Sequence, residues 1–420
     1  MRGSARANLC QSVGTTDEDR FIPRIGCSQV PDLHRVFPTG VIFMAPMRIH
    51  LLIMSLLLVG CIDTAPMTVE EMNAQLGGGP TDGPICSSEE LDVLPPETLR
   101  MHVIDVGQGD AIWIQTPWEV DQESESHNVL IDAGSAGDHS NGSPGGDIVV
   151  DYMLRRGMEF GAPLHAVVIT HAHEDHFGGL PVVASAFEIL RYSDPGGLIG
   201  ASSFLSARQA AISEVLSGGG SVDSPAADTL AASLFSSVDL FGPRVSAQLL
   251  WAREQSLSGN VDNLSGTDVN NTSVVFALQW PPKGYANSRQ ILLMGDLESA
   301  GEELLLLEAA SASHTLGSHI LKVGHHGSST SSSDSFLAQV LPDEDANRWA
   351  VISSGRQTFG SDVTLPTPQT IDRLTDRLAD YHLLSTANRD DEKAAGEEHD
   401  DDHVVFTITA EGTVTGCYAP

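Results

Sequence analysis

Four potential metal ligands lie within six consecutive residues of this chain, directly after an apolar segment. The segment 165–170, HAVVIT, has the pattern of a buried strand, and His171, His173, Asp175 and His176 follow it. Imidazoles and a carboxylate crowded together would gain nothing in an apolar core, but they suit zinc, iron or manganese. A turn after the strand can direct the first two histidines toward one metal, and Asp175 with His176 toward another. The cluster therefore predicts a metal site at the end of a strand; a chance polar loop is the alternative.

From residue 100 onward, strand-like and helix-like segments alternate irregularly. Short β-branched runs that end at Gly, Pro or Asp predict strands, among them the segments 101–107, 111–116, 128–134, 247–252, 273–280, 290–296, 319–326, 349–354, 381–386 and 403–410. Helical spacing predicts helices at 147–157, 298–310, 366–380 and in parts of 202–237. This alternation predicts one layered α/β domain that spans residues 100–420.

The amino-terminal part has the features of an export signal. Residues Leu51–Val59 form an apolar run that is too short for a bilayer, which needs ~20 apolar residues. Arg48 precedes this run, and the small residue Gly60 follows it. A basic start, a short apolar stretch and a small residue predict a secretory signal over 47–60. A buried helix or strand is the alternative.

Two further segments flank this signal. Residues 1–46 show no periodicity, and we interpret them as a doubtful N-terminal extension, with the true start at Met44 or Met47. Residues 61–99 are rich in Gly, Pro, Thr and acidic residues. They predict a flexible tether with a random-coil span of roughly 30–35 Å.

The cysteines fit an exported chain. Cys10 and Cys27 fall in the doubtful extension. Cys86 and Cys417 would be free to pair in an oxidising compartment, which would join the start of the domain to its end. Two free thiols are the alternative, and the sequence does not choose between them.

The chain is strongly acidic, with 22 Lys and Arg against 56 Asp and Glu and a formal net charge of −34. This balance excludes a general basic face for nucleic acid or anionic lipid. A polyanionic substrate would therefore need a local cation, for which a bound metal is suited. The acidic run Asp390–His403 predicts a solvated loop between two late strands, with a loose divalent-cation site as the alternative.

The motif H-x-H-x-D-H after an apolar strand resembles the signature of the metallo-β-lactamase fold superfamily. Four further motifs resemble, in the expected order, those of the extracytoplasmic hydrolase domain of the ComEC DNA-internalisation family. They are IDVGQGDA at 104–111, LIDAG at 130–134, LLMGD at 292–296 and LKVGHHGSSTS at 321–331. The resemblance spans nearly everything from residue 100 to the end. It implies an α/β fold, the four-layered αββα metallo-β-lactamase sandwich.

The sequence Leu58–Cys61, LVGC, resembles a bacterial lipobox. This resemblance implies that Cys61 is lipidated and becomes the first residue of the mature protein. It also implies an exported protein, lipid-anchored in the bacterial cell envelope at the outer membrane or the periplasmic face.

The superfamily resemblance implies two divalent metal ions, zinc or manganese. The first ion would be bound by His171 and His173, the second by Asp175 and His176, and both by the bridging Asp296. His325 would complete the second site, with His326 as an alternative that the sequence leaves open.

Four other residues are implied to support these ligands or the substrate. Asp132 would steer the histidine loop by hydrogen bonds. Asp105 and Asp110 would support the site, although a simple turn or capping role is an alternative. Ser328 would hydrogen-bond a substrate phosphate; in the alternative, the serine-rich stretch around it is a helix start with Ser or Asp as N-cap.

The chain departs from the superfamily pattern in two places. Many members have another first-site histidine between the histidine cluster and the Gly-Asp motif, but the segment 177–293 contains none. Asn271 occupies the approximate place. An amide oxygen or a water is a weaker ligand than imidazole, so the first site is expected to bind weakly, to favour manganese, or to fill only with substrate. The segment 359–368 also replaces a Gly-His-Pro found in ComEC-like chains.

The metal ligands predict a metal-dependent hydrolase, in which a metal lowers the pKa of water from 15.7 to about 7. The ComEC resemblance implies that it hydrolyses phosphodiester bonds, in the manner of a nuclease. Asp175 or Asp296 would orient the attacking water. One alternative is a hydrolase of lactone, thioester or β-lactam substrates; another is a lipid-anchored scaffold with a vestigial site. We expect a phosphodiester or small-molecule substrate and contact with the membrane through the lipid anchor. We expect no transmembrane channel, and the sequence points to no protein partner.

Overall fold

The computed structural model describes most of the chain between residues 84 and 419. The described ranges are 84–119, 126–136, 145–196, 201–224, 234–262, 264–282, 284–342, 347–355, 358–359, 363–388 and 402–419. The predicted extension 1–46, the predicted signal 47–60 and Cys61 lie outside the described residues.

The first of two β-sheets has eight strands in the order β19-β18-β1-β2-β3-β5-β7-β8. It is antiparallel from β19 to β3 and parallel from β3 to β8. Its strands are β1 (Leu99–Val103), β2 (Ile112–Gln115), β3 (Asn128–Ile131), β5 (Ala166–Val168), β7 (Arg191–Ser193), β8 (Ser221–Asp223), β18 (Val404–Ile408) and β19 (Val414–Tyr418).

The second sheet has seven strands in the order β17-β14-β13-β12-β11-β10-β9. It is antiparallel from β9 to β12 and parallel from β12 to β17. Its strands are β9 (Ser236–Val238), β10 (Ser246–Trp251), β11 (Val275–Trp280), β12 (Arg289–Leu293), β13 (Ile320–Lys322), β14 (Trp349–Ile352) and β17 (Leu383–Ser385).

Alternate residues of the strands supply two different cores. In β2, Ile112 and Ile114 face the apolar layer between the two sheets, whereas Trp113 packs under the helices of the first sheet. In β11, Phe276 enters the layer between the sheets, and Val275 packs under the helices of the second. Successive side chains of a strand point to opposite faces, so these strands are apolar throughout because both of their faces are buried.

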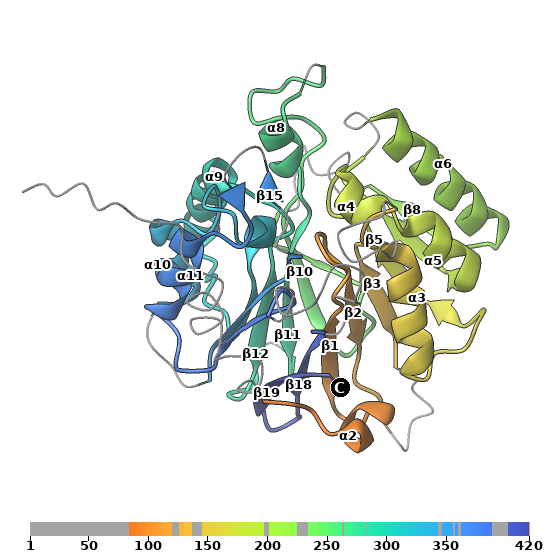
Figure 1. The fold of residues 1–420 in the computed structure, drawn as a ribbon, viewed down its shortest axis with the longest axis horizontal. Helices are drawn as coiled ribbons and strands as arrows, with labels where there is room; N and C mark the ends of the chain where they lie inside the picture. Colours follow the sequence, from red (N-terminus) through yellow and green to blue (C-terminus); the bar gives the residue numbers. More distant parts are fainter. Residues whose placement is uncertain are drawn as a thin grey trace, which may run out of the picture. The chain divides into compact units, whose positions relative to one another are not determined.

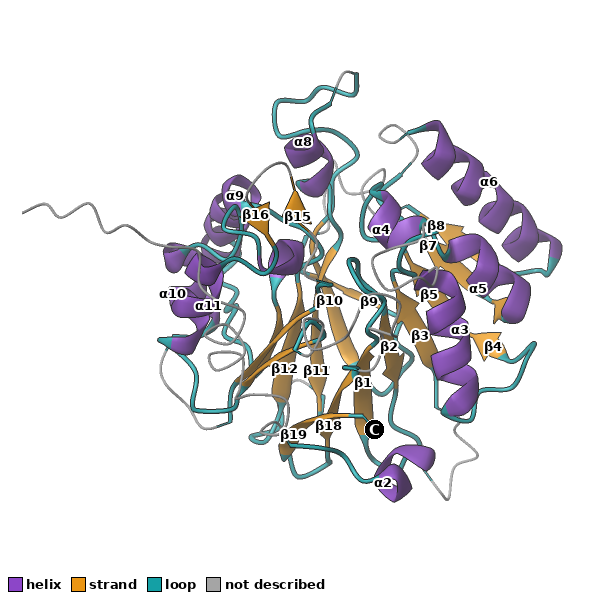
Figure 2. Cartoon of the chain, viewed as in Figure 1, coloured by secondary structure: helices purple, strands orange, loops and turns teal. Residues whose placement is uncertain are grey.

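Helices cover the outer face of each sheet and complete four layers (Figure 1). The first sheet is covered by α3 (Gly145–Arg155), α5 (Leu180–Ala186) and α6 (Ser202–Ser217), and the second by α9 (Ser299–Ser311), α10 (Asp334–Val340) and α11 (Pro368–Thr375). Figure 2 shows the strands stacked between these two groups of helices. The predicted αββα sandwich is confirmed. Within the described ranges, no helix has both the length and the apolar character needed to cross a membrane.

Short elements make up the rest of the described structure. They are α2 (Ser88–Asp92), α4 (Glu174–Phe177), α8 (Gly266–Asn270), the 3₁₀ turn η1 (Gly324–Gly327), and the strand pairs β4 (Pro163–Leu164) with β6 (Glu188–Ile189) and β15 (Thr358–Phe359) with β16 (Val363–Thr364). The helix predicted at 366–380 is shorter than expected and ends at Thr375.

The folded domain begins before residue 100. Ile85 forms a parallel bridge with Tyr418, and α2 follows three residues later. Arg100 then donates a 3.0 Å hydrogen bond from Nη1 to the carbonyl oxygen of Leu91. The predicted extension of the flexible tether to residue 99 is therefore wrong for residues 84–99. Their composition, rich in Pro and acidic residues, does not reveal a partner strand more than 300 positions away.

A disulfide joins Cys86 to Cys417, across a sequence separation of 331 residues. Cys417 belongs to β19, an edge strand of the first sheet. The pairing alternative that the sequence left open is therefore the one found, and the crosslink ties the segment before α2 to the last strand.

The end of the acidic run is buried, contrary to the prediction of a solvated loop. Asp402 is fully buried, and His403 is 5% exposed. Nδ1 of His403 accepts a 3.0 Å hydrogen bond from the backbone N–H of Asp105, and its ring packs on Tyr152. Residues 390–401 lie outside the described ranges.

Candidate metal centre

The predicted ligands follow strands that end at one edge of the sandwich. The loop 171–176 follows β5, Asp296 follows β12, and the histidine pair at 325–326 follows β13. β5 is parallel to β3, and β12 is parallel to β13. Parallel strands finish at the same edge of a sheet, which is where open α/β folds bind ligands. Contacts between the loops of the two sheets then bring together residues that are more than 100 positions apart, such as His171 and Asp296.

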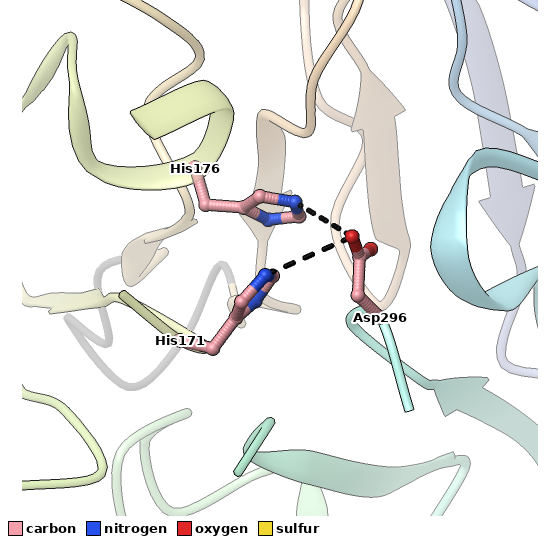
Figure 3. A group of neighbouring side chains, drawn as sticks. All are labelled: His171, His176 and Asp296. Atoms are coloured by element: carbon pink, nitrogen blue, oxygen red, sulfur yellow. Dashed lines mark ion pairs between the residues drawn. The ribbon is translucent and has the colours of Figure 1, made fainter. Parts of the chain in front are cut away.

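In Figure 3, two buried imidazoles, those of His171 and His176, converge on one carboxylate oxygen of Asp296. Oδ2 of Asp296 lies 3.7 Å from Nε2 of His171 and 3.3 Å from Nε2 of His176. Figure 3 shows both imidazole rings directed at this carboxylate. Each of the three offers one ligand atom within 4.8 Å of the other two.

A second group shares His176 with the first and adds Asp175 and His326. Nε2 of His326 lies 3.3 Å from Oδ2 of Asp175 and 3.3 Å from Oδ2 of Asp296. Nε2 of His176 lies 3.3 Å from the same His326 nitrogen. Asp296 thus contacts members of both groups, which is the arrangement expected of a bridging carboxylate.

His173 lies beside the first group. Its Nδ1 is 3.0 Å from Nε2 of His171, so the two histidines predicted to share a metal present neighbouring nitrogens. His171 is fully buried, whereas His173 is only partly so.

The structure distinguishes the two adjacent histidines of η1. His326 enters the cluster, and its Nδ1 donates to the carbonyl oxygen of Ser353 at 2.9 Å. His325 turns away, with its Nδ1 2.9 Å from Oγ1 of Thr330, and it joins none of the metal-type groups that the described residues form. Both histidines have left-handed backbone angles, with φ of 48° and 53°. This conformation separates the two rings, whose centroids lie 6.1 Å apart.

Several buried atoms of the cluster have no partner in the described part of the chain. Oδ1 of Asp296 and Oδ1 of Asp110 make no hydrogen bond there. Two pairs of ring nitrogens face each other, His171 with His173 and His176 with His326. A hydrogen bond uses only one proton for each pair. A cation instead accepts a lone pair from each nitrogen. Imidazole and carboxylate are ligands for zinc or manganese. The residues present therefore fit a divalent metal.

The pKa values of the histidines divide them into two classes. Burial lowers the pKa of His171 well below its ordinary value, and repulsion from His176 adds to this. Burial also lowers the pKa of His173. Both rings are therefore neutral, the form that binds metals. Burial acts in the same direction on His176 and His326, but the carboxylate of Asp296, with others around it, raises both pKa values well above the ordinary one.

The carboxylates of Asp296 and Asp175 are ionised. Burial alone would raise the pKa of Asp296, but His326 and His176 hold it well below its usual range. His176 and His326 also lower the pKa of Asp175 against the effect of burial. Metal binding requires deprotonated carboxylates, so this electrostatic setting favours a cation at the same place.

Asp132 anchors the histidine loop through hydrogen bonds to Thr170 and His176. Its Oδ1 accepts from the backbone N–H of Thr170 at 2.7 Å, and its Oδ2 accepts from the Thr170 hydroxyl at 2.7 Å. The same Oδ2 lies 2.8 Å from Nδ1 of His176. This contact fixes the proton of His176 on Nδ1 and leaves its Nε2 for the cluster.

Asp110 is supported by a residue that the sequence analysis did not single out. Nζ of Lys322 donates to Oδ2 of Asp110 at 2.7 Å, and both side chains are buried. Oδ1 of Asp110 lies 3.5 Å from Nδ1 of His326. The position of Lys322 in a predicted strand next to the HHG sequence could have identified it as part of the site. The sequence does not show, however, that its ammonium group is buried.

The turn after β1 presses against the histidine loop. Gly109 has a φ of +143°, and a Cβ at this position would lie 2.4 Å from the carbonyl oxygen of Asp175. Only glycine permits this approach. The carboxylate of Asp105 accepts from the backbone N–H of Gly107 and from that of Asp402, which is the turn role given above as an alternative.

Ser328 does not reach the cluster by any hydrogen bond of the described residues. Its hydroxyl pairs with that of Thr330 at 3.0 Å. Ser333 is the N-cap of α10, with its side chain accepting from the N–H of Phe336, as the alternative reading of the serine-rich stretch predicted.

Asn271 is turned away from the histidines. Its Nδ2 donates to the carbonyl oxygen of Thr267. Its Oδ1 would lie 2.5 Å from a Cβ placed on Gly301 of α9. The preceding residue, Asn270, instead contacts His325.

Comparison with known proteins agrees with this geometry. Residues 104–200 match the family described as the metallo-beta-lactamase superfamily. The chain is 26% identical over 266 residues to ComE operon protein 3 of Bacillus subtilis (strain 168), which covers 61% of this chain and 28% of that protein. It is 45% identical over 67 residues to Recombination protein 2 of Haemophilus influenzae (strain ATCC 51907 / DSM 11121 / KW20 / Rd), which covers 16% of this chain and 7% of that protein.

The chain spans only part of these curated relatives, 28% of the first and 7% of the second. Among solved structures, Rm3 metallo-beta-lactamase aligns with a TM-score of 0.27 and 14% identity over 55% of this chain and 66% of that one.

The family match begins at the turn after β1 and includes the whole histidine loop. The two facing sheets and their outer helices supply the corresponding architecture. The folded part of this chain therefore has the metallo-β-lactamase fold and is similar to the metallo-beta-lactamase superfamily and to the ComEC-type hydrolase domain.

Proposed function

We propose that this protein hydrolyses phosphodiester bonds, in the manner of a nuclease, with two divalent metal ions held at the cluster. One observation carries the proposal. Oδ2 of Asp296 lies within 3.7 Å of ring nitrogens of His171, His176 and His326. A carboxylate oxygen shared by imidazoles from separate loops is suited to bridge a two-metal site. A divalent metal there would supply a Lewis acid and lower the pKa of water to about 7.

Asp175 and Asp296 take different roles in this proposal. The side chain of Asp175 is 24% exposed, whereas that of Asp296 is 2% exposed. His326 contacts Oδ2 of Asp175 at 3.3 Å, while Oδ1 lies 4.0 Å from the nearest His176 nitrogen. We therefore assign Oδ1 of Asp175 to orient the attacking water and receive its proton, and Asp296 to hold the ligand cage together.

Zinc and manganese both suit this donor set, and we propose that the two ions bind unequally. The second site is built from Asp175, His176, Asp296 and His326, whose ligand atoms converge. The first has two neighbouring imidazoles, His171 and His173, besides the shared carboxylate. A site with fewer protein ligands binds its ion more weakly.

Two features support a phosphodiester substrate. Divalent ions would offset the negative potential of a chain with net charge −34, which otherwise repels a polyanion. In addition, one relative carries the name Recombination protein 2, and recombination acts on nucleic acid.

The acidic charge instead favours a second candidate function, the hydrolysis of an uncharged carbonyl substrate such as a lactone, thioester or β-lactam. Such a substrate would approach this surface without repulsion, and the same activated water would attack its carbonyl carbon. The two functions differ in substrate and share the ligand cage.

A paired assay distinguishes the two functions. Metal-stripped protein is reloaded with Mn²⁺ or Zn²⁺ and assayed with bis(p-nitrophenyl) phosphate, single-stranded DNA, a p-nitrophenyl carboxylic ester and a lactone. We expect metal-dependent cleavage of the two phosphodiesters. Cleavage of the carbonyl substrates alone would establish the second function, and no turnover with either metal would leave a scaffold with a vestigial site.

We further propose that the protein is exported and lipid-anchored in the bacterial cell envelope through Cys61. The disulfide between Cys86 and Cys417 supports an oxidising compartment. Replacement of Cys61 by Ala should shift the protein from the membrane fraction to the soluble envelope fraction. Unchanged membrane attachment of this variant would contradict the anchor.

A further inference from the structure

Asn270 is buried at the end of α8 with its side-chain oxygen unpartnered. The residue is 2% exposed, and its Oδ1 makes no hydrogen bond with any described residue. A buried amide oxygen without a partner costs about 1–3 kcal/mol. Such an atom calls for an explanation, and a bound cation is one that satisfies it.

The orientation of the Asn270 amide is fixed by its nitrogen. Nδ2 donates to Oε1 of Glu298 at 2.8 Å and lies 3.3 Å from Nε2 of His325. Rotating the amide by 180° would place its oxygen against the Glu298 carboxylate, so the observed assignment is the favourable one. Oδ1 is thereby held on the side away from Glu298 and His325.

The helix that carries Asn270 lies against His173 at its first residue, Gly266. A Cβ placed on Gly266 would lie 3.9 Å from Cε1 of His173 and 4.0 Å from its Nε2. Gly266 and Asn270 begin and end α8, and residues four apart lie on the same helix face. The face of α8 that carries Asn270 is therefore the face turned toward His173.

The neighbouring Asn271 lies on a different side of the same segment. Its Nδ2 donates to the carbonyl oxygen of Thr267, while its Oδ1, which also has no hydrogen-bond partner among the described residues, points at Gly301 of α9. Its backbone carbonyl accepts from Nε1 of Trp251 at 3.0 Å. Asn271 thus packs against the second sheet and its helix, while the side chain of Asn270 lies beside His325 and Glu298.

We propose that Oδ1 of Asn270, not that of Asn271, is the third protein ligand of the metal held by His171 and His173. The inference rests on the two-metal centre of the proposed function and names the ligand that its first site would otherwise lack. Glu298 and His325 then have a defined task, because their hydrogen bonds to Nδ2 orient the ligand. An amide oxygen in place of a third imidazole makes this site harder, which favours Mn²⁺ over Zn²⁺.

Metal binding tests the assignment without reference to turnover. Metal-stripped protein is titrated with MnCl₂ and with ZnCl₂ by calorimetry, and retained metal is counted by mass spectrometry after desalting. The parent should bind one ion tightly and one weakly. Asn270→Ala should weaken the second binding event at least about tenfold and leave the tight one unchanged. Asn271→Ala, the matched control, should keep both events.

A second variant keeps the test decisive if Asn270→Ala does not fold. The double substitution Asn270→Asp with Glu298→Gln reverses the direction of the hydrogen bond between the two side chains and presents a carboxylate oxygen in place of the amide. It should strengthen the weak binding event at least about tenfold. Folding of each variant is checked by its circular dichroism and thermal melt before titration.

The outcomes separate this inference from the proposed function. If Asn270→Ala binds both ions with parental affinity, or if Asn271→Ala loses the weak event instead, the ligand assignment is overturned. An unchanged weak event in the double variant would overturn it as well. If the parent binds both ions as expected but cleaves no phosphodiester, the ligand assignment stands and the proposed function fails.

Discussion

The ammonium nitrogen of Lys322 lies 2.7 Å from Oδ2 of Asp110, and both side chains are buried. The pair connects the last residue of β13 with the turn that follows β1. Because Oδ1 of Asp110 lies 3.5 Å from His326, the lysine neutralises a carboxylate next to a proposed metal ligand. It thereby keeps one negative charge of the cluster paired, and it fixes the start of the turn that carries His325 and His326.

Replacement of Lys322 by Met should destabilise the protein by about 3–5 kcal/mol, because it leaves Asp110 buried and unpaired. The free energy of unfolding, measured by denaturant titration of the metal-free protein, reports this loss. The double variant with Asp110→Asn removes the unpaired charge and should recover a large part of it. A single variant as stable as the parent would show that the ion pair does not support the fold.

Replacement of Asp296 by Asn should lower kcat/KM for the proposed phosphodiester substrate by more than about 100-fold. The change preserves the shape of the side chain and removes the charge that His171, His176 and His326 share. Metal content measured on the same sample should fall in parallel. Full activity with full metal content would refute a bridging role for this carboxylate.

The two histidines of η1 should give different losses when each is replaced by Ala. His326→Ala removes the ring that contacts Asp175 and Asp296, so the tight metal-binding event should disappear. His325→Ala should leave the tight event intact and weaken only the other one, because His325 contacts Asn270. Calorimetric titration with Zn²⁺ compares them, and the reverse pattern would exchange their roles.

Stability should fall with acid because two histidines are buried in neutral form. Burial lowers the pKa of His102 from 6.5 to about 3, and burial lowers that of His403 to about 3 as well. Between these values the unfolded chain binds a proton at each histidine and the folded chain does not, so unfolding is favoured as the pH drops below 6.5. Each histidine should lower the free energy of unfolding by about 2 kcal/mol at pH 5 relative to pH 7.

Unfolding free energies measured from pH 7 to pH 5 test this dependence. Replacing His102 by Phe should reduce the slope by about one proton, or ~1.4 kcal/mol per pH unit at its steepest. A slope that is identical in parent and variant would show that His102 is charged in the folded state.

Removal of the disulfide by the double substitution Cys86→Ser with Cys417→Ser should reduce stability by about 2–5 kcal/mol. The expected cause is the freedom regained by an unfolded chain that was closed across 331 residues. Thermal melts with and without reductant measure the effect. The parent should lose stability on reduction and the variant should not; equal melting of all samples would contradict a stabilising crosslink.

Local patterns predicted a large part of this site. The apolar segment before His171 and the crowding of ligands after it are visible in the sequence, because a strand and its following loop are contiguous. The position of Asp296 came from a resemblance, and the topology then explains it: β12 ends at the same edge as the histidine loop. The strand and helix patterns predicted a layered α/β domain, the resemblance implied the four-layered sandwich, and the structure explains it by strands whose two faces are both buried.

The features of the site that the sequence did not predict depend on the orientation of side chains and not on the residue types. Asn270 and Asn271 are identical in type, and only the rotation along α8 separates them. The choice between His325 and His326 depends on backbone angles that the sequence HHG does not encode visibly. The burial of Lys322 requires the turn after β1 to lie against β13, a contact between residues more than 200 positions apart.

The left-handed backbone at both residues of the histidine pair restricts what evolution or an engineer can place there. Side chains with a branched Cβ are excluded from this region of backbone space, while glycine, asparagine, aspartate and histidine are tolerated. Deleting one histidine would do more than remove one ring. The remaining histidine would occupy a different position in the turn, and its ring would point in a different direction. The two histidines therefore have to be kept together: neither the deletion of one of them nor a β-branched residue such as valine is compatible with this backbone.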